Sequence, residues 1–285
     1  MAKVSGTTRI TGIFGDPVGH TLSPAVQNAA FEELELDMVY LPFHVREEAL
    51  AGAVGAIRAL NMAGVNVTIP HKESVTALLD EVDEDARNTG AVNTVVNTDG
   101  RLVGYNTDGK GFLASLAEET NFNPGGKVVM LLGAGGAARG ILAALLKERP
   151  KKVIIANRTS SRAEALAEEF AGKFPDVEVE AAGLNHGPAL EETELLVNST
   201  SAGMEGKDVL DIPLEKLRPD AIVSDIVYSP LETALLKGAE KRGLRTHGGL
   251  GMLVHQGALG FELWTGKKAP IDIMRAAALA ALEAK

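Results

Sequence analysis

A glycine-rich turn is the first feature of this chain whose residue types and spacing could do chemistry. Residues 128–132 are all apolar, as in a strand buried on both faces, and run directly into Gly133-Ala134-Gly135-Gly136. Glycines there allow a tight bend and let a pyrophosphate approach free N–H groups at the start of the next helix. Gly140 comes one position later than the usual third glycine, so Gly136 or Ala137 must make the close contact. The turn predicts a dinucleotide site, with a plain strand-to-helix connection as the alternative.

The residues after the next predicted strand, 153–156, indicate which dinucleotide binds. A site for NAD normally carries Asp or Glu there, to accept hydrogen bonds from the ribose hydroxyls. This chain has Asn157-Arg158-Thr159 instead, with Arg162 four residues after Arg158 and no acidic residue before Glu164. Two guanidinium groups can bind a 2′-phosphate bidentately. The pattern favours NADP, and the alternative is a solvated pair of arginines on one helix face.

Polar side chains near the N-terminus suggest a second, smaller binding site. Thr21 and Ser23 lie just before a predicted helix at 25–34, and two hydroxyls beside a helix N-terminus can bind a carboxylate. The simpler interpretation makes Ser23 the N-cap, with Pro24 at the first helical position. Asn66 and Thr68 share one face of a predicted strand at 65–69. Because strands of α/β sheets are usually apolar on both faces, this polar face indicates a cleft or a sheet edge.

A lysine and an aspartate complete the candidates that follow from the residues alone. Lys72 follows Pro70-His71 at the start of a predicted helix that reaches residue 79. A cation is unfavourable at a helix N-terminus, so Lys72 is a candidate for proton exchange, with an ordinary surface lysine as the alternative. We expect His71 on the surface, since nothing in the sequence pairs with it. Asp108 lies in the segment 106–112 that opens a predicted helix ending near residue 118, and capping that helix is its simpler role.

The composition limits the class of protein. The chain has 285 residues, enough for two domains, and a formal net charge of -10, which argues against a general nucleic-acid surface. The absence of Cys excludes disulfides, thiolate catalysis and cysteine metal sites. The first ten residues lack the apolar core of a signal peptide, and no apolar run reaches membrane-spanning length. We therefore expect a cytoplasmic protein.

Strands alternate with helices along the chain, which predicts an α/β fold with parallel sheets. An Asp-Gly pair at 99–100 predicts a hairpin within this pattern. The loops at the carboxyl ends of such strands, including 198–204, are where an open sheet binds its ligand. Strands are predicted at 9–14, 38–45, 65–69, 91–96, 102–105, 128–132, 153–156, 177–181, 195–197, 221–227 and 245–247. Helices are predicted at 25–34, 47–60, 70–79, 106–118, 137–147 and 161–170, from 229 and 248 onward, and at 276–285.

Seven segments of the chain, including the motifs described above, together strongly resemble the shikimate dehydrogenase family. The matches come in family order and cover nearly the whole chain. They are HTLSP at 20–24, NVTIPHK at 66–72, GAVNT at 90–94, GYNTDGKG at 104–111, the glycine turn, NRT at 157–159 and GLGMLVHQG at 249–257.

The resemblance implies reduction of 3-dehydroshikimate to shikimate with NADPH, in aromatic amino-acid and chorismate biosynthesis. It implies a Rossmann-type NADP domain at 109–248, between the segments 1–108 and 249–285 of a mainly parallel substrate domain. It makes Lys72 and Asp108 the catalytic pair. The implied substrate contacts are Thr21, Ser23, Asn66, Thr68, Lys72, Asn93, Asp108, Tyr228 and Gln256. The implied NADP contacts are Gly133, Ala134, Gly135, Gly136, Ala137, Asn157, Arg158, Thr159, Arg162, Thr200, Ile226, Gly249 and Met252.

The implied reaction agrees with the residue types. A ketone that accepts a hydride develops negative charge on its oxygen, which Lys72 can stabilise and protonate. Asp108 can orient Lys72 and the substrate hydroxyls, while Thr21 and Ser23 would hold the substrate carboxylate. The family usually has Ser where this chain has Thr21, so the donor is kept and one methyl group is added. We expect a modest effect on shikimate and an altered tolerance for quinate.

Other functions remain open at this stage. A quinate/shikimate dehydrogenase using NAD(P) is the nearest, but that branch tends to carry an acid where this chain has Asn157. A non-catalytic NADP-binding regulator is disfavoured by the presence of Lys72 and Asp108, and a methyltransferase by the lack of an acid for the ribose. The expected partners are NADP and a small-molecule substrate, with no metal, nucleic acid or membrane. The chain is expected to be a monomer or a homodimer.

Overall fold

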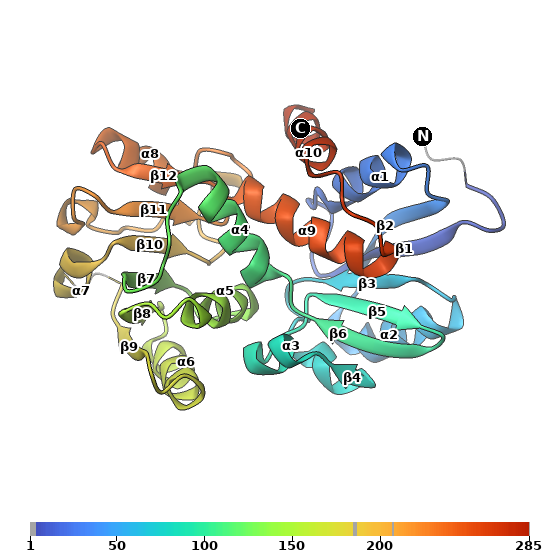
Figure 1. Ribbon diagram of the computed structural model, residues 1–285, viewed down its shortest axis with the longest axis horizontal. Helices are drawn as coiled ribbons and strands as arrows, with labels where there is room; N and C mark the ends of the chain where they lie inside the picture. Colours follow the sequence, from blue (N-terminus) through green and yellow to red (C-terminus); the bar gives the residue numbers. More distant parts are fainter. Residues whose placement is uncertain (1–3, 185–186, 207, 285) are drawn as a thin grey trace. The chain divides into compact units, whose positions relative to one another are not determined.

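The chain folds into two compact α/β units (Figure 1). The computed structural model describes residues 4–184, 187–206 and 208–284. The first unit comprises Met1–Gly111 and Leu253–Lys285, and the second comprises Phe112–Met252. These junctions lie three and four residues after those predicted at 108/109 and 248/249.

The first unit is built on a six-stranded mixed sheet. Its strand order is β2(Met38–His44), β1(Arg9–Gly15), β3(Gly64–Val67), β5(Thr94–Thr98), β6(Arg101–Tyr105) and β4(Glu81–Val82). Three of its five strand pairs are parallel, while β5 runs antiparallel to both β3 and β6. The hairpin predicted from Asp99-Gly100 is confirmed, because these two residues join β5 to β6 and both adopt positive φ.

Helices cover both faces of this sheet. One face packs against α2(Leu50–Ala59) and the short elements η2(Ser74–Leu78) and α3(Glu84–Thr89), around an aliphatic core. On the other face α1(Ser23–Glu33) packs against α10(Ile271–Glu283) and, through stacked Phe31 and Phe261, against α9(Gly249–Thr265). The short helix η1(Glu47–Ala49) precedes α2.

The second unit contains six parallel strands in the order of a doubly wound dinucleotide fold. The order is β12(Arg245–His247), β11(Ile222–Asp225), β10(Leu195–Asn198), β7(Val128–Leu132), β8(Lys152–Ala156) and β9(Glu178–Ala182). The Rossmann-type arrangement implied by the family resemblance is therefore confirmed. Its other elements are α4(Asp108–Thr120), which begins in the first unit, α5(Gly136–Lys147), α6(Ser160–Lys173), α7(Gly187–Glu192), α8(Ala234–Lys241), η3(Met204–Gly206) and η4(Leu214–Lys216).

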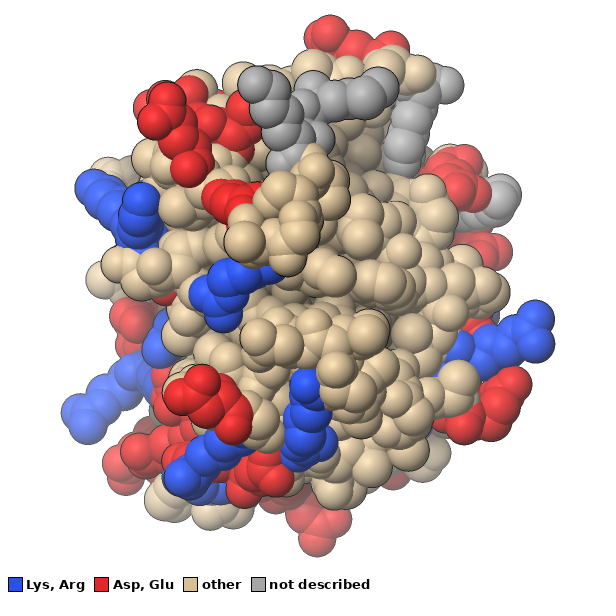
Figure 2. Space-filling view, turned by 90° about the vertical axis from the view of Figure 1, so that its right-hand side faces the viewer, with Lys and Arg blue, Asp and Glu red and all other residues tan. Residues whose placement is uncertain are grey.

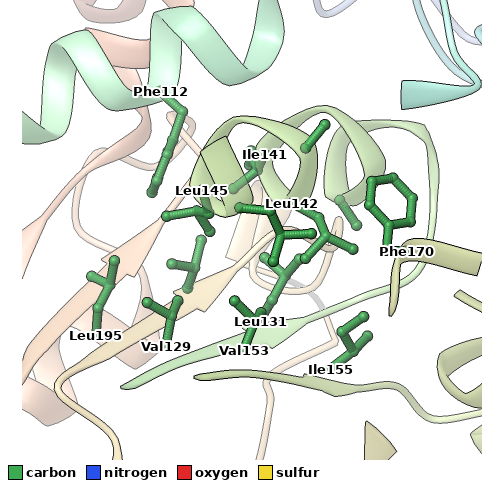
Figure 3. Close-up of a cluster of buried hydrophobic side chains, with 14 of the residues drawn as sticks. Phe112, Val129, Leu131, Ile141, Leu142, Leu145, Val153, Ile155, Phe170 and Leu195 are labelled. Atoms are coloured by element: carbon green, nitrogen blue, oxygen red, sulfur yellow. The ribbon is translucent and has the colours of Figure 1, made fainter. Parts of the chain in front are cut away.

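Alternate residues of the central strands in this unit pack on opposite faces. Val129, Leu131, Val153 and Ile155 pack with side chains of α4, α5 and α6 (Figure 3). The intervening residues, such as Met130, pack with side chains of α7 and α8. This burial on both faces explains why the strands are continuous apolar runs rather than alternating ones.

Three local predictions are wrong. The predicted cap Ser23 is the first residue of α1, and Leu22 stands at the N-cap position without a side-chain hydrogen bond. Residues 70–73 form turns, followed by the 3-10 helix η2 rather than an α-helix. The helix predicted from 229 begins at Ala234, where Thr233 caps it by accepting from the N–H of Leu236.

Two further observations concern helix length and surface charge. None of the helices in the described ranges is long and apolar enough to cross a membrane. On the face shown in Figure 2, acidic and basic side chains are interspersed around a large area of other residues.

Gly64→Ala should destabilise the first unit by about 2–3 kcal/mol. A Cβ at Gly64 would collide with the carbonyl oxygen of Val95 and the indole nitrogen of Trp264, which are themselves hydrogen-bonded at 3.0 Å. Urea unfolding measures the loss. The matched control is Gly55→Ala in α2, where a Cβ meets nothing within 4 Å, and which should be neutral or stabilising by up to about 1 kcal/mol. Equal unfolding midpoints for the two variants would contradict this account.

Candidate active site

Lys72 and Asp108 form an ion pair that is largely removed from water. Lys72 lies in the turn after β3, and Asp108 is the first residue of α4. Nζ of Lys72 lies 2.5 Å from Oδ2 of Asp108, and the two side chains are 13% and 5% exposed. The structure thus brings together the two residues predicted to be catalytic, which are 36 positions apart in the chain.

Asn93 holds the other oxygen of this carboxylate. Its Nδ2 donates to Oδ1 of Asp108 at 2.8 Å, and its Oδ1 accepts the backbone N–H of Thr107 at 2.8 Å. Because a backbone N–H only donates, this contact fixes which amide atom faces Asp108. The backbone N–H of Asp108 donates to Oδ1 of Asn106 at 3.1 Å. The predicted capping role therefore belongs to Asn106, which leaves the Asp108 carboxylate to Lys72 and Asn93.

Two more predicted substrate contacts join this network. Asn66 donates through Nδ2 to the carbonyl oxygen of Asn93 at 3.1 Å, and the Oε1 of Gln256 in α9 lies 3.4 Å from Nδ2 of Asn93. Thr68 follows the end of β3, with its methyl group against the position where a Cβ on Gly15 would lie. The contacts predicted from the sequence do not include Tyr40 and Thr94, whose hydroxyls bond to the Asn66 side chain.

The two predicted carboxylate ligands bond to each other. The hydroxyl of Thr21 donates to the Ser23 hydroxyl at 3.2 Å, and its oxygen accepts the Ser23 backbone N–H at 3.2 Å. Ser23 is 7% exposed at the start of α1. The two hydroxyls are therefore adjacent at a helix N-terminus, as the sequence predicts.

The prediction that His71 is a surface residue is wrong. His71 is fully buried, and its Nε2 lies 2.6 Å from the carbonyl oxygen of Val45. Since a carbonyl only accepts, Nε2 carries the proton in this contact. His71 thereby anchors the turn that carries Lys72 to the segment after β2. No sequence signal marks this bond, because its acceptor is a backbone atom 26 residues away.

In the second unit, the glycine turn combines a tight bend with open space before α5. Gly133 adopts a φ of +116°, and a Cβ there would approach the Ser199 hydroxyl oxygen at 2.7 Å, so only glycine fits. Above Gly135, by contrast, a Cβ would meet nothing within 4 Å. Helix α5 begins at Gly136 and has no acidic residue in its first turn. Its positive end is therefore open to an anion.

The two arginines lie at the start of α6. Arg158 precedes this helix and Arg162 lies in its first turn, which the positive end of the helix dipole makes unfavourable for a cation. Both residues are exposed, and neither side chain has an ion pair or hydrogen bond with another described residue. Asn157 donates to the carbonyl oxygen of Thr159 at 3.0 Å and carries no charge. This arrangement suits a phosphate group rather than a ribose hydroxyl.

The loops after β10 and β11 are held by a buried acid. Asp225 accepts from Asn198 at 2.9 Å and from Thr233 at 2.7 Å, and its burial raises its pKa. The same Asn198 accepts from the hydroxyl and N–H of Thr200 through Oδ1, and its carbonyl oxygen accepts the N–H of Ile226. Thr200 and Ile226, two predicted cofactor contacts, are thus fixed at the carboxyl edge of the sheet.

The remaining predicted contacts also lie in the second unit. At Gly249 a Cβ would collide with the carbonyl group of Ile226, so this glycine allows the start of α9 to pack on that loop. Met252 is buried in the core around α5. Tyr228 follows β11, whereas the other predicted substrate contacts belong to the first unit.

The fold and the site together define a class of protein. A doubly wound sheet with an open glycine turn is a dinucleotide-binding unit, and a lysine-aspartate pair among amides is equipped for proton transfer to a small polar molecule. These features define a pyridine-nucleotide-dependent oxidoreductase built from two α/β units.

Comparison with known proteins identifies the family. Residues 13–95 match the shikimate dehydrogenase substrate binding domain, residues 115–206 match shikimate/quinate 5-dehydrogenase, and residues 249–279 match the shikimate 5′-dehydrogenase C-terminal domain. The NADP(+) shikimate dehydrogenase of Methanopyrus kandleri is 49% identical over 283 residues, covering 97% of each chain. That of Desulforamulus reducens is 46% identical over 280 residues, covering 96% of this chain and 95% of its own. The chain belongs to the shikimate dehydrogenase family.

Solved structures agree with this assignment. A shikimate dehydrogenase in complex with NADP+ is 41% identical and covers 99% of this chain and 98% of its own, with a TM-score of 0.92. The Thermus thermophilus enzyme in complex with NADP(H) and shikimate is 39% identical, with coverages of 96% and 100% and a TM-score of 0.87. Quinate dehydrogenase from Corynebacterium glutamicum in complex with NAD is 31% identical, with coverages of 96% and 99% and a TM-score of 0.88.

A buried histidine links β11 and β12 to α4. Nδ1 of His247 lies 2.8 Å from the hydroxyl of Ser224, and Nε2 lies 2.8 Å from that of Ser115. Burial lowers the pKa of His247, while the charge of Glu119, 3.8 Å away, opposes that shift. The neutral imidazole is therefore the folded-state form over a wider pH range than in the unfolded chain.

This network predicts a loss of stability in mild acid. Because the unfolded chain protonates His247 near pH 6.5 while the folded chain resists it, the unfolded state binds more protons below that pH. Between pH 7.5 and pH 5.5 the parent should lose more unfolding free energy than His247→Gln. Urea unfolding of both proteins at the two pH values measures this difference. Parallel pH profiles would contradict it.

Proposed function

We propose that this chain reduces 3-dehydroshikimate to shikimate with NADPH, and catalyses the reverse reaction, as part of aromatic amino-acid biosynthesis. The observation that carries the proposal is the Lys72–Asp108 pair, held by Asn93, in a chain whose relatives of the same length are NADP(+) shikimate dehydrogenases. The same pair argues against a regulator without catalytic activity.

Lys72 is the proposed general acid. NADPH supplies the hydride when bound, and the negative charge then develops on the ketone oxygen. The Lys72 ammonium group stabilises that oxygen and gives it a proton, and in the reverse direction the neutral amine takes the proton from the hydroxyl group. Asp108 keeps the amine in place through its Oδ2, while Asn93 prevents the carboxylate from rotating away.

Hydroxyl and amide groups bind the rest of the substrate in this proposal. The adjacent hydroxyls of Thr21 and Ser23 hold the carboxylate at the N-terminus of α1, with the Thr21 hydroxyl turning its hydrogen from Ser23 to the carboxylate. Asn66, Thr68 and Gln256 contact the ring hydroxyls, with Tyr228 as a further predicted contact from the second unit. Thr21 keeps the donor of the more usual Ser, and its extra methyl group is expected to affect quinate more than shikimate.

The second unit supplies a site that fits NADP. Open space above Gly135 and the free N–H groups at the start of α5 suit the pyrophosphate, with Ala134 and Ala137 alongside. Arg158 and Arg162 suit the 2′-phosphate, with Thr159 beside them. The contacts of Thr200, Ile226, Gly249 and Met252 with the cofactor stay predictions.

Quinate turnover with NAD has weaker support. The similarity to a quinate dehydrogenase covers 96% of the chain at a lower identity of 31%. The segment with the neutral Asn157 and the two arginines also lacks the acid that an NAD site uses for the ribose. The cytoplasmic location and the monomeric or homodimeric state stay predictions.

Lys72→Ala should lower kcat for shikimate oxidation by about 10²- to 10⁴-fold, because the general acid-base group is lost. NADP+ affinity, measured by fluorescence titration, should stay within about twofold of the parent's. Lys110→Ala is the control, since Lys110 is 63% exposed and pairs with Asp85 instead. A turnover by Lys72→Ala close to that of the parent would sink the assigned role.

Replacing both Arg158 and Arg162 by Ala should raise KM for NADPH about ten- to a hundred-fold and leave KM for NADH nearly unchanged. The physical reason is the loss of two charged donors to the 2′-phosphate. Initial rates of 3-dehydroshikimate reduction with each nucleotide measure the ratio. Arg242→Ala, which removes another exposed arginine of the second unit, serves as the control. Proportional losses with both nucleotides would reject the 2′-phosphate assignment.

A further inference from the structure

A buried tyrosine hydroxyl lies directly behind the predicted substrate contact Asn66. Tyr40 in β2 is fully buried, and its ring packs against Trp264 with centroids 6.0 Å apart. Its hydroxyl lies 2.7 Å from Oδ1 of Asn66. A buried phenol hydroxyl needs a hydrogen-bond partner, and here that partner is a side chain of the proposed active site.

The contacts of Asn66 settle which way its amide group points. Nδ2 of Asn66 lies 3.1 Å from the backbone carbonyl oxygen of Asn93, an atom that only accepts. A second donation, to the Thr94 hydroxyl at 3.0 Å, uses the other amide hydrogen. The atom facing Tyr40 is therefore the carbonyl oxygen Oδ1, and the tyrosine hydroxyl must be the donor. With both hydrogens occupied, Asn66 has only acceptor capacity left for a substrate.

From Asn66, hydrogen bonds of the same donor-to-acceptor direction continue to the carboxylate of Asp108. The Thr94 hydroxyl donates to Oδ1 of Asn93 at 3.1 Å, and Nδ2 of Asn93 donates to Oδ1 of Asp108 at 2.8 Å. Tyr40 donates into a chain of hydrogen bonds that passes through Asn66, Thr94 and Asn93. Fixed amide orientations along such a chain keep the polarity of the whole network constant.

We propose that Tyr40 is a positioning residue that sets the polarity of substrate recognition at Asn66. By donating to Oδ1, it holds this oxygen in place with one lone pair free. The site thereby accepts a hydrogen bond from a substrate hydroxyl, and it disfavours an analogue with an ether or carbonyl oxygen at the same position. This inference rests on the proposed function, because it treats Asn66 as a contact for a shikimate hydroxyl.

Tyr40→Phe tests the proposal, because it keeps the buried ring and removes only the donor. KM for shikimate should rise about fivefold, the effect of roughly one neutral hydrogen bond, with kcat and KM for NADP+ within about twofold of the parent's. Thr11→Val is the matched control. Thr11 pairs with Tyr40 in the β1–β2 register, and its fully buried hydroxyl donates to the carbonyl oxygen of Val39 at 3.0 Å. This control should lower the melting temperature without changing KM for shikimate.

A double-mutant cycle with Asn66→Ala separates positioning from general damage. If Tyr40 acts through Asn66, Tyr40→Phe should have no further effect on KM in the Asn66→Ala background. A fivefold effect that persists there, or an equal rise in KM for Thr11→Val, would overturn the role of Tyr40 and leave the proposed function standing. Absence of shikimate turnover by the parent would overturn both.

Discussion

The buried ion pair between Lys72 and Asp108 is the constraint that the polar residues of the first unit must satisfy. Taking two charges out of water costs several kcal/mol per ion, and removing one partner leaves an uncompensated buried charge. Hydrogen bonds to the carboxylate offset part of this cost, and the sheet makes them possible because three of its strands bring polar residues to the same end. In the register Asn66 pairs with Thr94, and Thr94 pairs with Tyr105. Three strand ends therefore meet: the end of β3, the start of β5 and the end of β6. Lys72 follows β3, Asn93 directly precedes β5, and Asp108 follows β6.

In the second unit, too, the ends of neighbouring strands bring the proposed binding residues together, but here all the strands are parallel. Carboxyl ends of parallel strands lie on one side of the sheet, so the loops after β7, β8, β10 and β11 converge there. The pairing of Asn198 with Asp225 in the β10–β11 register then fixes two of these loops to each other. A buried carboxyl with a raised pKa is tolerated because it accepts several hydrogen bonds.

The sequence was most informative where one physical cause dominates. Continuous apolar runs predict the central strands of the second unit, and the run of glycines predicts the bend after β7. Prediction from the sequence fails where two local structures share one pattern, or where the decisive hydrogen-bond partner is distant in the chain. The 3-10 helix after Lys72 has the same apolar spacing as an α-helix over so few residues, and the bond between His71 and the carbonyl of Val45 has no sequence signature. Tyr40 was missed for the same reason, since only the fold brings its hydroxyl to Asn66.

The proposed substrate site contains few charged groups, so neutral hydrogen-bond donors must bind the substrate carboxylate. Lys72 is the one cation in the network described above, and Asp108 already neutralises it, so the substrate carboxylate would meet the hydroxyls of Thr21 and Ser23. Neutral donors bind an anion more weakly than a guanidinium group does, but they bind with defined geometry. Affinity in such a site depends on how rigidly each neutral group is held. The buried hydrogen-bond partners of Asn66 and Asn93 provide this rigidity. The orientation of neutral groups, rather than charge, is therefore the proposed source of substrate selectivity.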